Sequence, residues 1–227
     1  MTRTKEPQYE PALELRDREG FTRLGLTCNW MWDFDPKRMT FVFARYKFVA
    51  RMLEGRESAL EVGCADGFAS RIVRQAVGKL TAVDFDPNFI EDAKANSNPR
   101  WAIDFRHHNM LDGPVEGTFD AAYSIDVLEH IAPADEPVFM RNLCAPLAPH
   151  AVAVIGMPSL QSQTHASEAN KIAHINCKDG NQFRRDMGRY FHNVFVFSMN
   201  DELIHTGFYP MAQYLFALCC DPKREAS

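Results

Sequence analysis

The middle of the chain alternates between short apolar runs and longer stretches in which apolar residues recur every three or four positions. The runs predict strands, and the spaced apolar residues predict helices. Strands are predicted at residues 59–62, 80–83, 102–107, 119–124, 152–156, 192–198 and 212–219. Helices are predicted at residues 35–53, 68–76, 87–95, 134–147 and 178–190. Strands and helices therefore follow one another along most of the chain.

This order is typical of an α/β fold with mainly parallel strands, because a helix between two strands returns the chain to the same edge of the sheet. The crossovers are expected to be right-handed and to place helices on both faces. Only a loop separates strand 192–198 from strand 212–219, which indicates an antiparallel ending. We therefore expect a seven-stranded, mainly parallel sheet with an antiparallel final strand.

The ends of the chain and one internal segment lack this pattern. Residues 1–34 are predicted to form an N-terminal arm, loose up to about Gly20, with a possible acceptor-pocket segment at its end. Residues 35–220 form the main domain. Residues 159–177 are polar and contain histidine, and we interpret them as an insertion at the active-site edge. Residues 221–227 form a C-terminal tail.

Composition narrows the class of protein. A chain of 227 residues, 46% of them apolar, can bury the core of one domain. No apolar run approaches the roughly 18 residues of a membrane span, and the N-terminus lacks the apolar stretch of a signal peptide, so we expect a cytoplasmic protein without a membrane partner. A formal charge of -5 disfavours nucleic acid as the substrate. The six cysteines contain no CxxC pair, so they predict neither a zinc ribbon nor a disulfide framework.

A glycine-containing turn follows the first predicted strand, in residues 60–67. Gly63 and Gly67, with the small Ala65 between them, permit a sharp turn and a close approach of the backbone to a ligand. Asp84 ends the second strand, where its carboxylate can accept hydrogen bonds from two ribose hydroxyls. Because dinucleotide dehydrogenases share both features, the turn and the acid leave the nucleotide undefined.

The segment 119–131, FDAAYSIDVLEHI, is more specific. Together with the turn and Asp84 it resembles the class I, Rossmann-like methyltransferases that use S-adenosylmethionine (AdoMet), over residues 45–220. Members of that superfamily usually have a third glycine where this chain has Ala65. The resemblance implies a Rossmann-like fold, AdoMet as the cofactor, and membership of the small-molecule type.

The resemblance also implies the residues that bind AdoMet. Asn109 stands where the family usually has an acid for the adenine amino group, and Met110 is expected to pack on the adenine face. Arg45 is expected to pair with the methionine carboxylate of AdoMet and Tyr46 to hydrogen-bond to it. The complete predicted set is Arg45, Tyr46, Glu61, Gly63, Ala65, Gly67, Asp84, Phe85, Asn109, Met110 and Ile125.

Methyl transfer requires an aligned acceptor atom, about 3 to 3.5 Å from the methyl group, and a base for its proton. His130 is the first candidate base, with lining of the pocket as its alternative role, and Asp126 is a secondary catalytic candidate. Predicted acceptor-binding residues are Trp30, Glu129, His165 and His174, although Trp30 can equally be a core residue. A metal site built from His130, Asp126 and one of the later histidines is an alternative, but no ligand spacing demands a metal ion, and we predict none.

These features predict an AdoMet-dependent methyltransferase acting on an oxygen or nitrogen of a polar small molecule, such as a sugar, a nucleotide sugar or a natural product. We expect a monomer or a homodimer. Two alternatives stay open: methylation of RNA or protein, which predicts a basic patch that the sequence lacks, and a non-catalytic AdoMet-binding protein.

Overall fold

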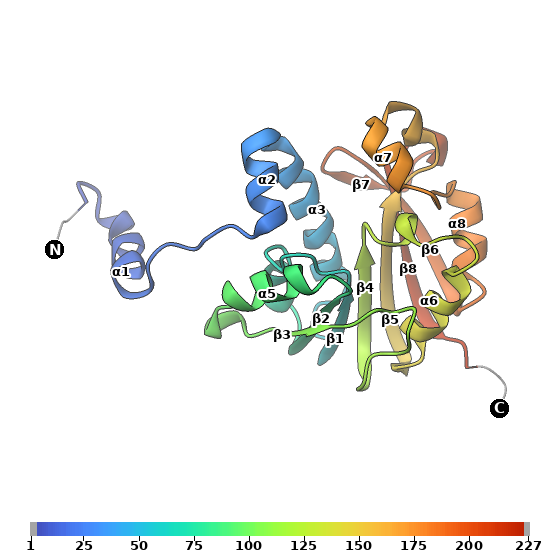
Figure 1. The fold of residues 1–227 in the computed structure, drawn as a ribbon, viewed down its shortest axis with the longest axis horizontal. Coiled ribbons are helices and arrows are strands. Elements are labelled where there is room, and N and C mark those ends of the chain that lie inside the picture. The colour runs from blue at the N-terminus through green and yellow to red at the C-terminus, as the bar shows by residue number, and fades with distance from the viewer. Residues whose placement is uncertain (1–3, 225–227) are drawn as a thin grey trace.

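An eight-stranded sheet forms the centre of the computed structural model, which describes residues 4–224 (Figure 1). The strands are β1 (Ser58–Val62), β2 (Lys79–Asp84), β3 (Asp104–His107), β4 (Phe119–Ile125), β5 (Leu147–Pro158), β6 (Phe191–Asn200), β7 (Leu203–His205) and β8 (Tyr214–Pro222). Their order in the sheet is β3-β2-β1-β4-β5-β8-β6-β7. Strands β1 to β5 pair in parallel, whereas β8 is antiparallel to both β5 and β6.

This arrangement confirms the predicted Rossmann-like α/β fold and its antiparallel ending, with one strand more than the seven expected. The additional strand is β7, which pairs antiparallel with the end of β6. It spans three residues inside the segment that the sequence presents as a loop. A strand of this length is too short to show an alternating pattern of apolar residues.

Helices cover both faces of the sheet, as predicted. They are α1 (Glu10–Glu19), α2 (Leu26–Phe34), α3 (Lys37–Met52), α4 (Ser70–Arg74), α5 (Pro87–Ala95), α6 (Glu136–Cys144), α7 (Glu168–Ala173) and α8 (Gly180–Met187). In β4, Ala121 and Tyr123 pack with residues of α3 and α4, whereas Ala122 packs with residues of α6 and α8. Side chains of consecutive strand residues point to opposite faces, which gives the sheet two separate apolar layers.

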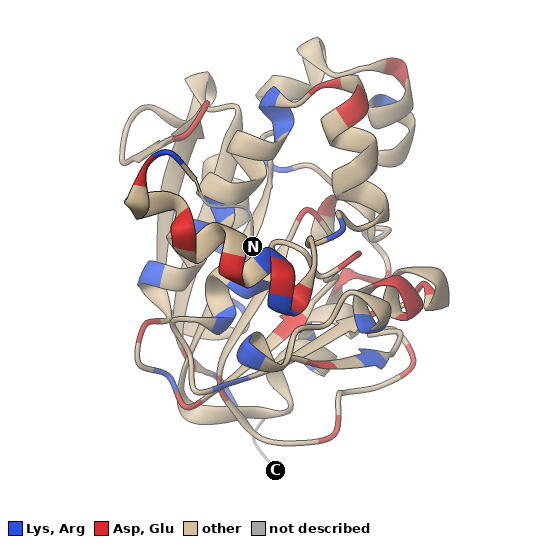
Figure 2. Ribbon diagram, turned by 90° about the vertical axis from the view of Figure 1, so that its left-hand side faces the viewer, with Lys and Arg blue, Asp and Glu red and all other residues tan. Residues whose placement is uncertain are grey.

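The N-terminal arm differs from the expected loose segment, because it forms the helix α1. No residue of α1 is buried, and Figure 1 shows the helix standing apart from the sheet. Acidic and basic residues are interspersed along it (Figure 2). Residues 1–3 of the arm and 225–227 of the C-terminal tail lie outside the described residues.

The second helix, α2, was not predicted, and the helix predicted from residue 35 begins at Lys37. Carboxylates from the main domain hold the start of α2. Asp92 accepts a hydrogen bond from the Leu26 N–H at 2.8 Å, and Asp66 accepts one from the Cys28 N–H at 2.9 Å. Helix starts are stabilised by such acceptors, and these come from residues far away in the sequence.

Among the described residues, no helix combines the length and the apolar character that crossing a membrane requires.

Candidate active site

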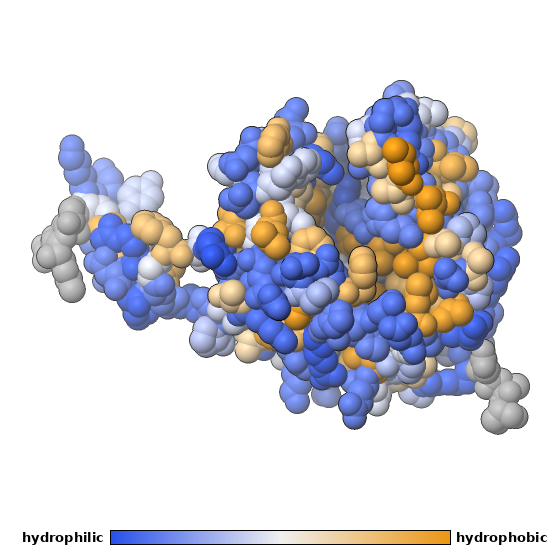
Figure 3. Space-filling model, viewed as in Figure 1, coloured by the Kyte–Doolittle hydropathy of each residue, from blue (hydrophilic) through white to orange (hydrophobic). Residues whose placement is uncertain are grey.

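A cavity of about 390 Å³ lies at the carboxyl ends of β1 and β4. Its walls come from α2 and α3, from the turn after β1, from the segment after β4, and from α7 with His174. Figure 3 shows a hollow between the part of the molecule formed by α2 and α3 and the part that contains α7. Open α/β sheets bind ligands at this position, where neighbouring strands connect in opposite directions. A larger surface groove between α3, α4 and β7 contains none of the predicted site residues.

The turn after β1 has the backbone that the sequence predicts. Gly63, Ala65 and Gly67 have φ angles of +83°, +46° and +66°. A Cβ atom on Gly63 would lie 2.1 Å from Cγ2 of Val127, so this position requires glycine for its angle and for its space. The turn therefore brings backbone groups to the cavity wall without a side chain between them.

Asp84 lies behind this turn, at the end of β2, and is 6% exposed. Its Oδ2 accepts a hydrogen bond from the Ala65 N–H and its Oδ1 accepts one from the Asp86 N–H, both at 2.9 Å. A carboxylate oxygen can accept more than one hydrogen bond. Asp84 is thus held in a fixed orientation while both oxygens keep some accepting capacity.

Glu61 and Tyr46 form a buried pair below the turn. The Tyr46 hydroxyl donates to Oε1 of Glu61 at 2.9 Å, and Oε2 of Glu61 has no hydrogen-bond partner. Burial raises the pKa of the Glu61 carboxyl to about 7. Tyr46, predicted to contact the cofactor, thus directs its hydroxyl to Glu61, although the residue also lines the cavity.

Arg45 and Asp126 form an ion pair at the cavity wall, with Nη1 and Oδ2 2.6 Å apart. The guanidinium carbon lies 4.0 Å from the ring centroid of Tyr214, which fixes its plane. Asp126 follows β4 directly and has a φ angle of +59°. Positive φ is uncommon outside glycine, and here it places the carboxylate next to α3.

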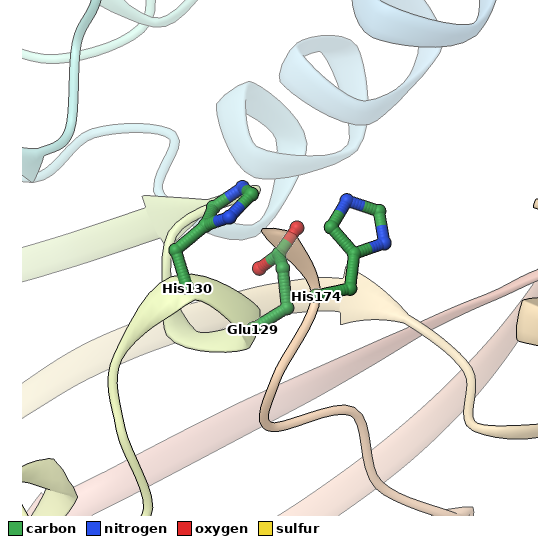
Figure 4. Close-up of side chains that lie close together, drawn as sticks. All are labelled: Glu129, His130 and His174. Atoms are coloured by element: carbon green, nitrogen blue, oxygen red, sulfur yellow. The ribbon is translucent and has the colours of Figure 1, made fainter. Parts of the chain in front are cut away.

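Glu129, His130 and His174 come together although His174 follows His130 by 44 positions in the sequence. All three line the cavity (Figure 4). One carboxylate oxygen and one nitrogen from each ring lie within 4.8 Å of one another. The two imidazole centroids are 5.1 Å apart, with an angle of 69° between the rings. We call these three residues the Glu–His–His cluster.

Each imidazole of the cluster is fixed by one hydrogen bond. Nδ1 of His130 lies 3.0 Å from the Ala173 carbonyl oxygen, and Nδ1 of His174 lies 3.0 Å from Oε1 of Gln163. Since both partners are acceptors, each Nδ1 carries the proton and donates. Burial raises the pKa of Glu129 well above its ordinary value and lowers the pKa of His174. Oε2 of Glu129 has no hydrogen-bond partner.

Two predicted acceptor-binding residues lie outside the cavity lining. Trp30 is 50% exposed and stacks on Phe34 with ring centroids 5.3 Å apart, while Met31 of the same helix lines the cavity. His165 is exposed in the short helix 161–165 and does not join the cluster. The structure thus brings His174 of the insertion to the cavity, but not His165.

The remaining predicted cofactor-binding residues, among them Asn109 and Met110 for adenine, lie in different environments. Phe85 is 71% exposed at the end of β2, and Ile125 lines the cavity. The amide oxygen of Asn109 already accepts a hydrogen bond from the Leu111 N–H at 3.1 Å. Met110 is a buried core residue, and its carbonyl accepts a hydrogen bond from Asn142. A core position accounts for Met110 without any ligand.

Asp66 is a cavity residue that sequence reasoning missed. It accepts hydrogen bonds from the Thr27 hydroxyl at 2.6 Å and from the Cys28 N–H, and so fixes α2 above the turn. A Cβ atom on Gly25 would lie 2.4 Å from the Asp66 side chain. The position of Asp66 next to Gly67, within the turn predicted to bind the cofactor, was a signal in the sequence. Its hydrogen-bond partners Thr27 and Cys28 lie in the N-terminal arm, far away in the sequence. Asn170 of α7 also lines the cavity without having been predicted.

The fold, the turn after β1 and the acid at the end of β2 agree with a class I methyltransferase, and the comparisons with known proteins separate this class from the dinucleotide dehydrogenases. Residues 60–155 match the family described as a methyltransferase domain. These findings confirm the predicted class: the chain carries a class I, AdoMet-dependent methyltransferase domain.

Relatives agree with this class. The chain is 27% identical over 133 residues to a ubiquinone biosynthesis O-methyltransferase of Xanthomonas campestris pv. campestris (strain B100). The matched region covers 53% of this chain and 52% of that protein. The chain is 28% identical over 134 residues to the O-antigen chain terminator bifunctional methyltransferase/kinase of Escherichia coli, covering 55% of the chain and 19% of that protein. The matched region thus spans about half the length of the first relative.

A solved structure has the same fold. The N-methyltransferase NodS of Bradyrhizobium japonicum WM9, in complex with S-adenosylhomocysteine, superposes with a TM-score of 0.59 at 17% identity. The match covers 85% of this chain and 92% of NodS. At this identity the likeness extends to the fold.

Proposed function

We propose that this chain transfers the methyl group of AdoMet to an oxygen or a nitrogen of a polar small molecule, of the sugar, nucleotide-sugar or natural-product type. One observation carries the proposal: a single cavity is lined both by the turn after β1 and by polar side chains from other elements. Those side chains are Arg45, Asp126, His130, Asn170 and His174. A polar acceptor held by them lies next to the backbone turn.

The residues present fit AdoMet. The open backbone of the turn suits close contact, and Asp84 is oriented to accept hydrogen bonds from ribose hydroxyls. The exposed ring of Phe85, next to Asp84, suits one face of an adenine. Ile125 offers an apolar surface, and Asn109 keeps its amide N–H groups, since only its oxygen is engaged within the chain. AdoMet, when bound, supplies a methyl group attached to a sulfonium, and the thioether of S-adenosylhomocysteine is the leaving group.

His130 is proposed as the general base for the acceptor. Its Nδ1–H donates to Ala173, which leaves Nε2 as the basic nitrogen of the neutral ring. His130 lines the cavity, so an acceptor hydroxyl or amine bound there can give its proton to Nε2. Asp126 is proposed as a positioning residue, because its carboxylate holds the Arg45 guanidinium.

The charge distribution supports a small acceptor. Figure 2 shows Lys and Arg interspersed with Asp and Glu on the side that it presents, rather than gathered into a basic face. An RNA substrate would require such a face for its phosphates. The names of the similar proteins include an O-methyltransferase and an N-methyltransferase, so both acceptor atoms stay in the proposal.

A product assay tests this function. Purified chain is incubated with AdoMet and a panel of polar metabolites, with bulk RNA and protein as comparison substrates, and S-adenosylhomocysteine is quantified. We expect turnover with at least one polar metabolite class and none with RNA or protein. Turnover with RNA or protein alone would overturn the acceptor class. AdoMet binding without turnover on any substrate would favour the non-catalytic alternative.

A further inference from the structure

The Glu–His–His cluster presents an unusual combination at the cavity wall: a buried carboxylate between two imidazoles (Figure 4). We propose that Glu129, His130 and His174 bind a divalent transition-metal ion such as Zn²⁺. The proposal departs from the expectation of no metal, which rested on sequence spacing, because His174 reaches the cluster only through the fold.

The ligand set suits such an ion. Imidazole nitrogens favour zinc, copper, iron and nickel, and two imidazoles with one carboxylate form a known type of catalytic zinc site. With metal–ligand bonds of about 2.0 to 2.2 Å, ligand atoms of a tetrahedral site lie roughly 3.3 to 3.6 Å apart. The present atoms lie within 4.8 Å of one another. A contraction of about 1 Å, for which His174 on its loop after α7 is well placed, completes the site.

The hydrogen bonds around the cluster support metal binding. A histidine that ligates a metal ordinarily donates its other ring N–H to a carbonyl or carboxylate oxygen, which fixes the tautomer and the ring plane. His130 and His174 both do so through Nδ1, to Ala173 and Gln163. In each ring Nε2 is therefore unprotonated, as ligation requires.

Charge around the cluster also favours a cation. Glu129 is 1% exposed, and its Oε2 has no hydrogen-bond partner. The neighbouring charged groups are Arg45 and Asp126, which pair with each other. Arg45 and Asp126 thus satisfy each other, whereas the buried Oε2 of Glu129 is left without a partner, which is unusual for a buried polar atom. A divalent ion held by the Glu129 carboxylate and the two imidazoles would supply that partner.

The role of the ion in the reaction rests on the proposed function. An ion with three protein ligands would keep a position open for another ligand, and the three residues that would hold it line the cavity. An acceptor hydroxyl bound there would have a lowered pKa, so its proton could leave to solvent. In the metal-bound protein His130 would be a ligand, and solvent rather than His130 would accept the proton.

Cobalt binding tests the site directly. The full chain, without a histidine tag, is titrated with Co²⁺ and followed by calorimetry and by visible absorption. We expect one ion per chain, with ligand-field bands of nitrogen and oxygen ligands and no thiolate charge-transfer band. His174→Ala and Glu129→Gln should each weaken binding by about tenfold or more, since even outer-shell changes have effects of that size. His165→Ala, in the same insertion but outside the cluster, should bind as the wild type does.

Three results would overturn the metal site. They are the absence of binding by the wild type up to about 1 mM Co²⁺, binding that persists in both ligand variants, and thiolate bands, which would assign the ion to cysteines. AdoMet affinity is measured on the same samples and should be retained in His174→Ala. Absence of cobalt binding by a wild type that still binds AdoMet would thus remove the metal site alone. Loss of AdoMet binding by the wild type would remove the proposed function instead.

Discussion

The two sides of the cavity are built in different ways. On the cofactor side, the turn 63–67 is held by Asp84, and the contacts join the ends of two adjacent strands, β1 and β2. On the acceptor side, α2, the segment after β4 and α7 come from distant parts of the chain. Asp66 holds α2, and the hydrogen bond between His130 and the Ala173 carbonyl joins the segment after β4 to α7. The cofactor side is therefore rigid and readable from local sequence, whereas the acceptor side depends on long-range contacts.

The largest expected effect is on the cofactor side. Gly63→Ala should lower the free energy of unfolding by about 3 to 5 kcal/mol, because it adds left-handed backbone strain to a steric clash with Val127. Gly55→Ala is the matched control: Gly55 has a φ angle of +81° but no atom within 4 Å of an added Cβ. Its loss should be about 1 to 2 kcal/mol. Urea unfolding measures both, and equal losses would contradict the packing described at the turn.

The next largest effect is a change in the free energy of unfolding with pH, caused by the Glu61 carboxyl. This carboxyl has a pKa of about 7 in the folded protein against 4.5 ordinarily, so between these values the unfolded chain releases a proton that the folded chain retains. Stability should therefore fall by about 3 kcal/mol as the pH rises from 4.5 to 7. Glu61→Gln should remove this component. Urea unfolding at several pH values checks it, and parallel curves for the two proteins would refute the assignment.

On the acceptor side, His130→Ala should lower turnover about 10²-fold if the ring is the general base or a metal ligand, while AdoMet affinity stays within about twofold. The reason is that His130 belongs to the segment after β4 and not to the turn, although both line the cavity. Single-turnover rates and calorimetry measure the two quantities. Full turnover would exclude His130 from the chemistry, and a large loss of AdoMet affinity would show that the two sides are not separate.

The smallest effect is expected at the start of α2. Asp92→Ala removes the acceptor for the Leu26 N–H and should destabilise α2 by about 1 kcal/mol. Amide exchange in α2 should become faster, and the KM for the acceptor should rise, with the Kd for AdoMet little changed. Unchanged exchange in α2 would mean that other contacts hold this helix.

The same division explains what the sequence could predict. The strands β1, β2 and β4 and the turn between β1 and α4 carry local signals: apolar runs, glycines and an acid at a strand end. The fold and the turn geometry were predictable for that reason. Phe85 and Asp84 also lie at the expected strand end.

The acceptor side was predicted less well because its signals are not local. Helix α2 begins at acceptors supplied by Asp66 and Asp92, so its sequence contains no capping side chain of its own. His174 and His165 look alike in a polar insertion, and only the path of α7 brings one of them to Glu129. Met110 shows the converse case, since a residue next to a motif position can belong to the core.

The most direct test of the account is calorimetry of AdoMet binding to the wild type and to Asp84→Ala. The account predicts binding by the wild type and a loss of about 2 to 4 kcal/mol, or roughly 30- to 900-fold in Kd, for a variant whose fold is verified by circular dichroism. No binding by the wild type at high micromolar AdoMet, or an unchanged Kd in a folded Asp84→Ala, would contradict it.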